Sequence, residues 1–278
     1  MRKIKIVADS SANVMELREV AFASAPMKII TSEREFVDTA ELDVDEMIAH
    51  FDVYKGKSKT SCPNAADWLE AFGDADEVFC VTITSGLSGS YNAACAAKQV
   101  YESEHEGRRV FVIDSLSAGP ELMLIIEKLE QLISQGTSYE DICAEIQAYC
   151  QKTGLLFMLE SLKNFAANGR VSPTVAKIAG ILGIRIVGKA SDNGVLEPLN
   201  KCRGEAKALN AIMSHLKEAG LEGGKVRIAH CKNQAAANEL KRMIIENMPQ
   251  ADVEIYLCRG LCSYYAELGG MMVGFEKM

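Results

Sequence analysis

The chain has 278 residues, a length that suits two domains because single hydrophobic cores stop growing near ~250 residues. Hydrophobic residues make up 48% and charged residues 24%, which is the balance of a globular chain and excludes a disordered one. A formal net charge of −8 argues against nucleic acid as a partner, since phosphate binding requires a basic surface.

The first half alternates short apolar runs with amphipathic stretches, a pattern typical of βα units around a parallel sheet. Strands are predicted at 4–9, 27–31, 78–84 and 110–114. Helices are predicted at 14–22, 44–54, 65–72, 90–101 and 121–135, and one more begins after Ser138, a favoured N-cap residue. The pattern predicts a three-layer α/β/α domain with a parallel sheet over residues 1–154.

The pattern changes in the second half of the chain. Strands are predicted at 155–159, 184–190, 195–202, 226–230, 253–257 and 271–275, and helices at 175–182, 205–219 and 235–248. Asn193-Gly194, between two of these strands, is a strong hairpin signal and implies antiparallel pairing. We therefore expect a two-layer α/β domain with a mixed sheet over residues 155–278, packed directly against the first domain.

Serine-rich loops follow three predicted strands of the first domain, at 9–11, 82–90 and 114–119. Ligands of parallel α/β sheets bind beyond the carboxyl ends of the strands, so these loops should converge. The middle loop leads through Ser88 into a helix whose free N–H groups favour an anion. A fourth segment, 59–64, adds two hydroxyls before Asn64, which can cap the next helix. Together the loops predict an anion-binding site.

Catalysis by one of these serines is the main alternative to binding. Neither a P-loop nor a G-x-G-x-x-G fingerprint occurs in the first βα turn, so a nucleotide is not favoured. Gly86-Leu87-Ser88-Gly89-Ser90 misses the G-x-S-x-G motif only at its last position, which leaves a serine esterase or thioesterase using Ser88 as an alternative. That enzyme would need a histidine base, for which His230 is the only attractive candidate.

The nine cysteines are scattered and contain no C-x-x-C pair, which predicts reduced thiols. His230, Cys231, Cys258 and Cys262 could meet at strand ends as metal ligands, but buried thiols on strands are the favoured interpretation. No segment has the ~20 apolar residues of a membrane span, and the start lacks a signal-peptide core. We therefore expect a cytoplasmic protein without a metal or cofactor.

Several motifs, taken together, resemble the DegV family in order and spacing. They are Thr60-Ser61-Cys62-Pro63, the run 83–94, Leu159-Glu160-Ser161-Leu162, Gly169-Arg170-Val171-Ser172 and Lys201-Cys202-Arg203-Gly204. The resemblance implies a bacterial fatty-acid-binding protein of two domains that does no chemistry alone. It also implies a role like that of the lipid-carrying subunit of fatty acid kinase, which presents the acyl carboxylate to a separate ATP-binding subunit that makes acyl phosphate.

The resemblance also assigns residues to roles. Thr60, Ser61, Ser88 and Gly89 would hold the carboxylate, and the ligand-binding residues would further include Ser85 and Tyr265. Arg170 and Arg203 would lie near the opening, where family members meet the kinase or, transiently, a membrane surface. The acyl chain needs an apolar tunnel, since each buried methylene contributes roughly 0.8 kcal/mol. Candidates for its wall are Met158, Phe165, Ile178, Ile181 and Leu182.

The chain departs from the family pattern near its end. The family usually has a His before a turn that contains Gly and Pro, whereas this position falls near Tyr265 and the Pro is absent. A Tyr hydroxyl can donate to a carboxylate but carries no positive charge near neutral pH, and Glu267 could oppose an anion. The ligand could therefore be an unusual acid or another lipid. A third possibility is a protein that has lost lipid binding and serves only as an interaction module.

Overall fold

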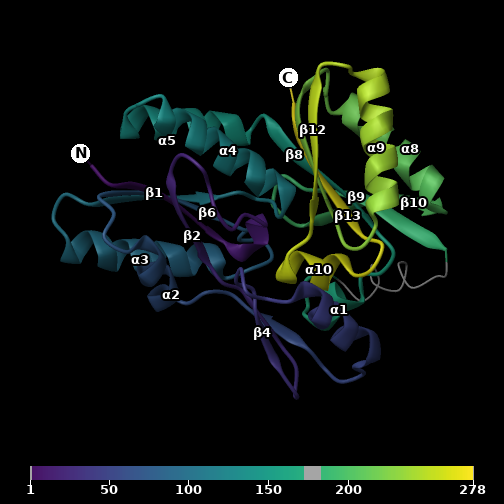
Figure 1. Ribbon diagram of the computed structural model, residues 1–278, viewed down its shortest axis with the longest axis horizontal. Coiled ribbons are helices and arrows are strands. Elements are labelled where there is room, and N and C mark those ends of the chain that lie inside the picture. The colour runs from purple at the N-terminus through teal and green to yellow at the C-terminus, as the bar shows by residue number, and fades with distance from the viewer. Residues whose placement is uncertain (1, 172–182, 278) are drawn as a thin grey trace.

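A computed structural model describes residues 2–171 and 183–277. Its first sheet has four parallel strands in the order β2-β1-β6-β7, formed by β1 (Ile4–Asp9), β2 (Ala21–Ala25), β6 (Glu77–Thr82) and β7 (Arg109–Asp114). Four helices cover its two faces: α2 (Ala65–Phe72) and α3 (Ser90–Glu104) on one, and α4 (Pro120–Ser134) and α5 (Tyr139–Cys150) on the other (Figure 1). The predicted three-layer architecture is confirmed.

The prediction of a helix over 14–22 is wrong. The chain leaves β1 through a short 3-10 turn (Ser10–Ala12) that ends at Asn13 in the left-handed conformation, and residues 21–25 then form the edge strand β2. The apolar side chains of this segment, Val14, Leu17 and Phe22, still pack against the core beneath α4 and α5. Apolar spacing alone cannot distinguish these outcomes, and hydrogen bonding of β2 to β1 decides in favour of the strand.

A second, three-stranded antiparallel sheet was not anticipated. It has the order β4-β3-β5, formed by β3 (Lys28–Ile30), β4 (Glu35–Val37) and β5 (Lys59–Ser61). The strand expected at 27–31 therefore exists but does not belong to the parallel sheet. Helix α1 (Val44–Val53) connects β4 to β5. This small sheet matters for function because β5 carries Thr60 and Ser61.

The third sheet has six strands in the order β10-β9-β8-β13-β11-β12. They are β8 (Thr153–Leu159), β9 (Ile184–Ala190), β10 (Leu196–Arg203), β11 (Gly224–His230), β12 (Ala251–Leu257) and β13 (Met271–Glu276). Its pairings are antiparallel except for β11 with β12, so the predicted mixed sheet is confirmed. The β9–β10 hairpin is also confirmed: Gly194 has a φ of 69° and donates its N–H to the carbonyl of Ser191 at 2.8 Å.

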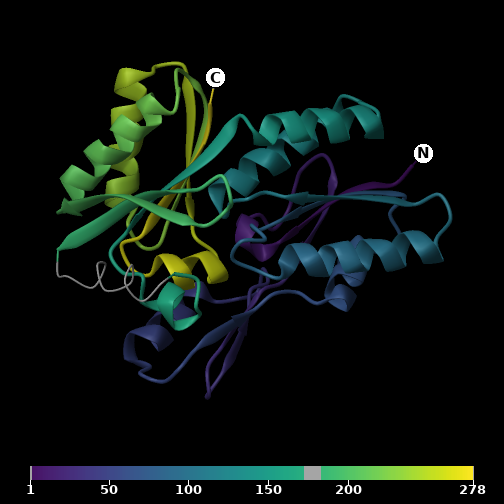
Figure 2. The same ribbon diagram turned by 180° about the vertical axis from the view of Figure 1, so that it is seen from behind.

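The two faces of this sheet have different neighbours. Helices α8 (Glu205–Glu218) and α9 (Gln234–Asn247) cover one face, as Figure 2 shows from behind. Because side chains alternate along a strand, Leu156 and Met158 of β8 point to that face, while Leu155, Phe157 and Leu159 point to the other. The second face is turned toward the first sheet, and it forms the wall of the cavity described below.

Two short helices that the sequence analysis missed lie on this inner side. They are α6 (Lys163–Ala167) and α10 (Gly260–Ala266). The helix expected at 175–182 falls outside the described residues. The division into domains at residues 154 and 155 stays a prediction, and β8 begins at Thr153. Within the described residues, none of the helices combines the length and apolar character needed to cross a bilayer.

Candidate functional site

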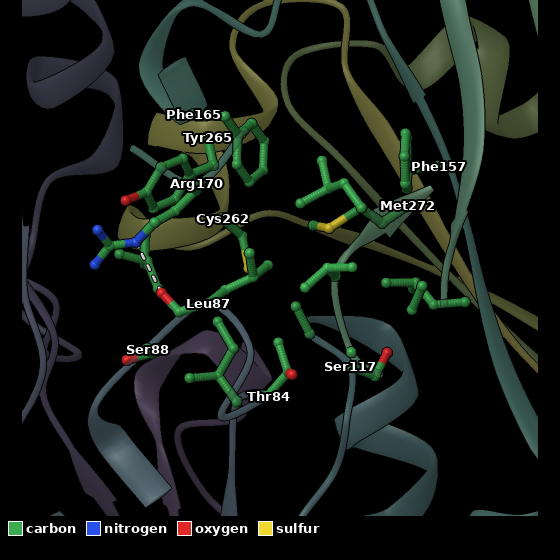
Figure 3. A pocket seen from close by; sticks show the side chains of 18 of the residues that line it. Thr84, Leu87, Ser88, Ser117, Phe157, Phe165, Arg170, Cys262, Tyr265 and Met272 are labelled. Carbon is green, nitrogen blue, oxygen red and sulfur yellow. Dashed lines mark hydrogen bonds between the residues drawn. The ribbon is translucent and has the colours of Figure 1, made fainter. Parts of the chain in front are cut away.

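A cavity of about 290 Å³ lies between the carboxyl ends of the parallel strands and the inner face of the six-stranded sheet. Its volume is close to the lower end of the ~300–1,000 Å³ usual for small-molecule sites. The hydroxyl of Ser88 and the guanidinium of Arg170 lie at one end, Phe157 and Met272 lie toward the other, and the hydroxyl of Ser117 lies on the side of Met272 (Figure 3). Most polar groups therefore gather at one end, and the rest of the lining is mainly hydrocarbon, apart from the hydroxyls of Thr84 and Ser117.

Asp9 organises the loop that forms the floor of the polar end. Its carboxylate accepts the hydroxyl of Ser90 at 2.6 Å, the N–H of Ile83 at 2.9 Å, and both the hydroxyl and the N–H of Ser11. Ile83 and Ser90 are the two ends of the serine-rich loop, so one buried side chain fixes both. Burial raises the pKa of Asp9, and the hydrogen bonds from Ser11, Ser90 and Ile83 oppose that rise.

Ser88 and Gly89 lie at the start of α3, as the sequence predicts. The hydroxyl oxygen of Ser88 accepts the N–H of Ser90 at 3.2 Å, so its own proton remains available to donate to a ligand. Gly89 precedes the helix with a φ of −77°, a value that any residue adopts. The first N–H groups of a helix lack intrahelical acceptors and favour negative charge, which makes this end of α3 suited to a carboxylate.

Thr60 and Tyr265 meet on the opposite side of the polar end. Their hydroxyl groups share a hydrogen bond of 2.7 Å, which leaves one of the two protons free to donate outward. The ring of Tyr265 packs on Phe165 with 4.6 Å between ring centroids. Burial raises the pKa of Tyr265, while Thr60 and the charge of Arg170 oppose that rise. The phenol is therefore neutral near neutral pH and acts as a donor.

Asp38, which the sequence analysis did not single out, anchors the helix that carries Tyr265. Its buried carboxylate accepts the N–H groups of Gly260 and Leu261, each at 2.9 Å, at the start of α10. A carboxylate at a helix N-terminus satisfies otherwise unpaired donors and interacts favourably with the helix dipole. Asp38 follows β4, so this contact ties the small antiparallel sheet to the C-terminal part of the chain.

Arg170 lies beside the polar end and lines the cavity. Its Nε donates to the carbonyl of Leu87 at 2.7 Å (Figure 3). A second guanidinium nitrogen donates to the carbonyl of Asn168. These bonds place a permanent positive charge next to the hydroxyl donors. Arg170, which is far from Tyr265 in the sequence, thus supplies the positive charge that Tyr265 cannot carry.

Several expected site residues lie elsewhere or contribute less. Ser61 lines the cavity but is exposed, and its hydroxyl donates to the carbonyl of Cys62 at 3.3 Å. Ser85 is exposed outside the lining, where its N–H donates to Asp114 at 3.0 Å. Arg203 is exposed at the end of β10, also away from the cavity. Glu267 turns to the N–H of Asn164 at 3.4 Å and does not oppose an anion in the cavity.

The apolar wall comes from residues that the sequence analysis mostly did not choose. Phe165 lines the cavity, but Met158 is fully buried on the other face of the six-stranded sheet. Ile178, Ile181 and Leu182 lie outside the described residues. The side chains that project from the sheet into the cavity are Leu155, Phe157, Leu159, Leu196 and Met272. Alternation along β8 separates these two sets, although it does not tell which set faces a ligand.

The described structure supports neither an esterase or thioesterase that uses Ser88 nor a metal site. No histidine occurs among the described residues that line the cavity, so Ser88 has no imidazole base there. His230 instead contacts the N–H of Asn233 and the side chain of Gln234, each at 3.1 Å. No metal-binding group of three or more His, Cys, Asp or Glu side chains occurs in the described part of the chain. Burial raises the pKa of the Cys231 thiol to about 11.

Comparison with known proteins reveals relatives over the whole length. A family model described as "Uncharacterised protein, DegV family" matches residues 3–277. A DegV domain-containing protein of Streptococcus pneumoniae is 44% identical over 276 residues, which cover 98% of both chains.

Two solved structures resemble this one closely. A DegV family protein from Eubacterium eligens, loaded with heptadecanoic acid, has a TM-score of 0.97 and 47% identity over 99% of this chain and 100% of its own. The Fatty Acid Kinase (Fak) B3 protein of Streptococcus pneumoniae, loaded with linoleic acid, has the same TM-score and coverage with 42% identity.

Proposed function

The chain belongs to the DegV family, and we propose that it binds a long-chain fatty acid in the cavity between its parallel sheet and its six-stranded sheet. The carboxylate lies at the end formed by Thr60, Ser88, Gly89 and Tyr265, and the acyl chain runs along the inner face of the six-stranded sheet. The polarity of the cavity is the observation that carries this proposal, because donors gathered at one end and mainly hydrocarbon over the rest match an amphiphile with one anionic group.

The polar end can satisfy a carboxylate fully. A carboxylate has about four acceptor positions, and here the Ser88 hydroxyl, the Thr60–Tyr265 pair and the start of α3 supply donors from different directions. Bonds to a charged acceptor are roughly twice as strong as neutral ones. The positive charge of Arg170 adds electrostatic stabilisation at the same end.

The acyl chain supplies most of the affinity. Each methylene that leaves water contributes about 0.8 kcal/mol, so a chain of about fifteen methylenes gains on the order of 12 kcal/mol before the entropic costs of binding. Leu155, Phe157, Leu159 and Met272 present the required hydrocarbon surface. A short-chain acid would make the same polar contacts without this gain, which favours long-chain ligands.

The proposal extends to how the lipid is used. The chain contains no nucleotide-binding motif, and the similar Streptococcus pneumoniae protein carries the name of a fatty acid kinase. We therefore expect this protein to work in bacterial fatty acid metabolism in the cytoplasm by presenting the carboxylate to a separate ATP-binding subunit. Exposed Arg203 is a candidate contact for that partner. A transient contact with the membrane surface would allow the lipid to be exchanged.

Extraction of the purified protein with organic solvent, followed by mass spectrometry, tests lipid binding. Long-chain fatty acids should be recovered in a near-equimolar amount, and the delipidated protein should take up a fatty acid again. An extract free of fatty acid, together with no uptake by the delipidated sample, would exclude the proposal. A mixture with ATP should yield acyl phosphate only when a fatty acid kinase subunit is added, which hydroxylamine trapping detects.

Gly86 should control how tightly the cavity is closed. The tip of the β9–β10 hairpin packs on the serine-rich loop, and a Cβ at Gly86 would come within 2.8 Å of the carbonyl oxygen of Asn193. Since Gly86 has no positive φ to be disturbed, Gly86→Ala should act by pushing the hairpin tip away. We expect faster release of a fluorescent fatty acid in stopped-flow exchange.

Ser85→Ala is the matched control for this substitution, because Ser85 is the neighbouring exposed residue outside the cavity lining. Its release rate should equal that of the unmodified protein. Equal release rates for Gly86→Ala and the unmodified protein would show that the hairpin tip does not limit lipid exchange.

A further inference from the structure

We infer that Phe157 is the fixed stop that sets the longest acyl chain the cavity accepts, an inference that rests on the proposed function. Phe157 lies on β8, across the cavity from Ser88, Tyr265 and Arg170 (Figure 3). Its side chain lines the cavity and yet is only 4% exposed. A fatty acid whose carboxylate is held at the polar end therefore extends its terminal methyl group toward this ring.

Gly188 explains why the ring is held in one place. Phe157 is paired directly with Gly188 of β9, and directly paired residues project from the same face of a sheet. A Cβ at Gly188 would lie only 2.4 Å from Cζ of Phe157, so the ring fills the space that a side chain there would occupy. The ring rests against the backbone of the neighbouring strand and cannot retreat in that direction.

Met272 lies on the other side of Phe157, but its side chain behaves differently. It is the partner of Phe157 on β13 and also lines the cavity. Methionine has three rotatable bonds and adapts to irregular spaces, whereas a phenyl ring backed by main chain does not. Met272 thus forms a pliable side wall, and Phe157 forms a rigid end wall together with Leu155, which lines the cavity two residues away on the same face of β8. Phe157 limits the length of the bound acyl chain, and Met272 accommodates bends in it.

This arrangement predicts a particular relation between chain length and affinity. Each methylene added to the ligand should tighten binding about fourfold while it finds new apolar surface. Once the terminal methyl group reaches Phe157, a further methylene can enter only if the ring leaves its packed position. The affinity should then stop rising and fall. The chain length at which this happens is the cut-off that Phe157 determines.

The test measures dissociation constants for straight-chain saturated acids from lauric to behenic acid in single-methylene steps. Phe157→Leu keeps an apolar side chain but removes part of the ring volume, so its cut-off should move to a chain longer by one or more methylenes. Phe165→Leu is the matched control, because Phe165 lines the same cavity but packs on Tyr265 at the polar end. It should weaken binding of all chain lengths and leave the cut-off unchanged.

The outcomes separate this inference from the proposed function. If the unmodified protein binds none of the acids, the function itself is wrong. If it shows a cut-off that Phe157→Leu leaves in place, or that Phe165→Leu moves equally, then Phe157 is not the stop. Should Phe157→Leu fail to fold, Phe157→Met fills a similar volume with a flexible chain and should blur the cut-off. An equally sharp cut-off in that variant would overturn the inference.

Discussion

Replacing Asp9 by Ala should lower the free energy of unfolding by about 3 kcal/mol, since each buried donor left unpaired costs about 1–3 kcal/mol. The substitution removes the acceptor of Ile83, Ser11 and Ser90 at once. The substitution also removes the unfavourable free energy of burying a carboxylate, and this offsets part of the cost. Fatty-acid affinity should fall as well, because the loop from Ile83 to Ser90 loses the group that holds both of its ends. Urea unfolding and ligand titration measure the two effects.

Asp114 provides the control for this prediction. It occupies the equivalent position at the end of β7 and accepts the N–H groups of Ser85 at 3.0 Å and Leu116 at 3.2 Å, but it is half-buried. Water can replace the lost acceptor there, so Asp114→Ala should cost about 1 kcal/mol. Equal losses in the two variants would show that the buried position of Asp9 has no special importance.

Asp9→Asn should reveal the titration of the carboxyl group through the pH dependence of stability. Burial raises the pKa of Asp9 above its ordinary value of 3.8. A group with a raised pKa in the folded state contributes stability below its ordinary pKa and loses that contribution as pH rises through the folded-state pKa. The unmodified protein should therefore lose stability relative to Asp9→Asn as pH rises from 4 toward neutrality. A difference that grows in the opposite direction would contradict the raised pKa.

Tyr265→Phe should weaken fatty-acid binding by about tenfold or more. The substitution removes one hydroxyl and keeps the ring that packs on Phe165. A hydrogen bond to a charged acceptor contributes about 1.5–3 kcal/mol, which corresponds to roughly ten- to hundredfold in the dissociation constant. The loss should be similar for fatty acids of every chain length, since only the carboxylate contact changes. Titration of the delipidated protein with fluorescent and unlabelled acids measures it.

Tyr264→Phe is an unusually close control, because the neighbouring hydroxyl faces away from the cavity. Tyr264 contacts the hydroxyl of Ser58 at 2.7 Å and the amide of Asn168 at 2.9 Å. It lines the separate groove next to α1. Its replacement should reduce stability slightly and leave the dissociation constant almost unchanged. If both variants bind equally well, the Tyr265 hydroxyl is not the donor to the carboxylate, and the free proton of the pair belongs to Thr60.

Tyr265→His should introduce a pH dependence that the unmodified protein lacks at this position. The phenol of Tyr265, with its raised pKa, stays neutral through the physiological range. A histidine with an ordinary pKa of about 6.5 becomes positively charged on acidification and then attracts the carboxylate. The affinity of the variant should therefore increase as pH falls through about 6.5, and isothermal titration at several pH values measures the increase.

The sequence predicted much of the architecture, because hydrophobic periodicity and segment length identify long helices and strands. The βα alternation, the hairpin at Asn193-Gly194 and the three-layer first part were all found from local pattern. Short elements escaped, since three residues of β4 or β5 carry too little periodicity to be recognised. The stretch 14–22 was misassigned because its apolar residues suit a helix face, while its last residues are held by β1 as a neighbouring strand.

The sequence by itself determined that hydroxyl-rich loops gather at the carboxyl ends of parallel strands. Tertiary structure alone decided which of their side chains face the cavity. Phe157 and Met158 are adjacent and apolar, and yet one lines the cavity and the other packs under α8 and α9. Arg170 reaches the polar end only through the fold. The physical reason is that local patterns follow from backbone geometry, whereas the face exposed to a ligand depends on how distant segments pack.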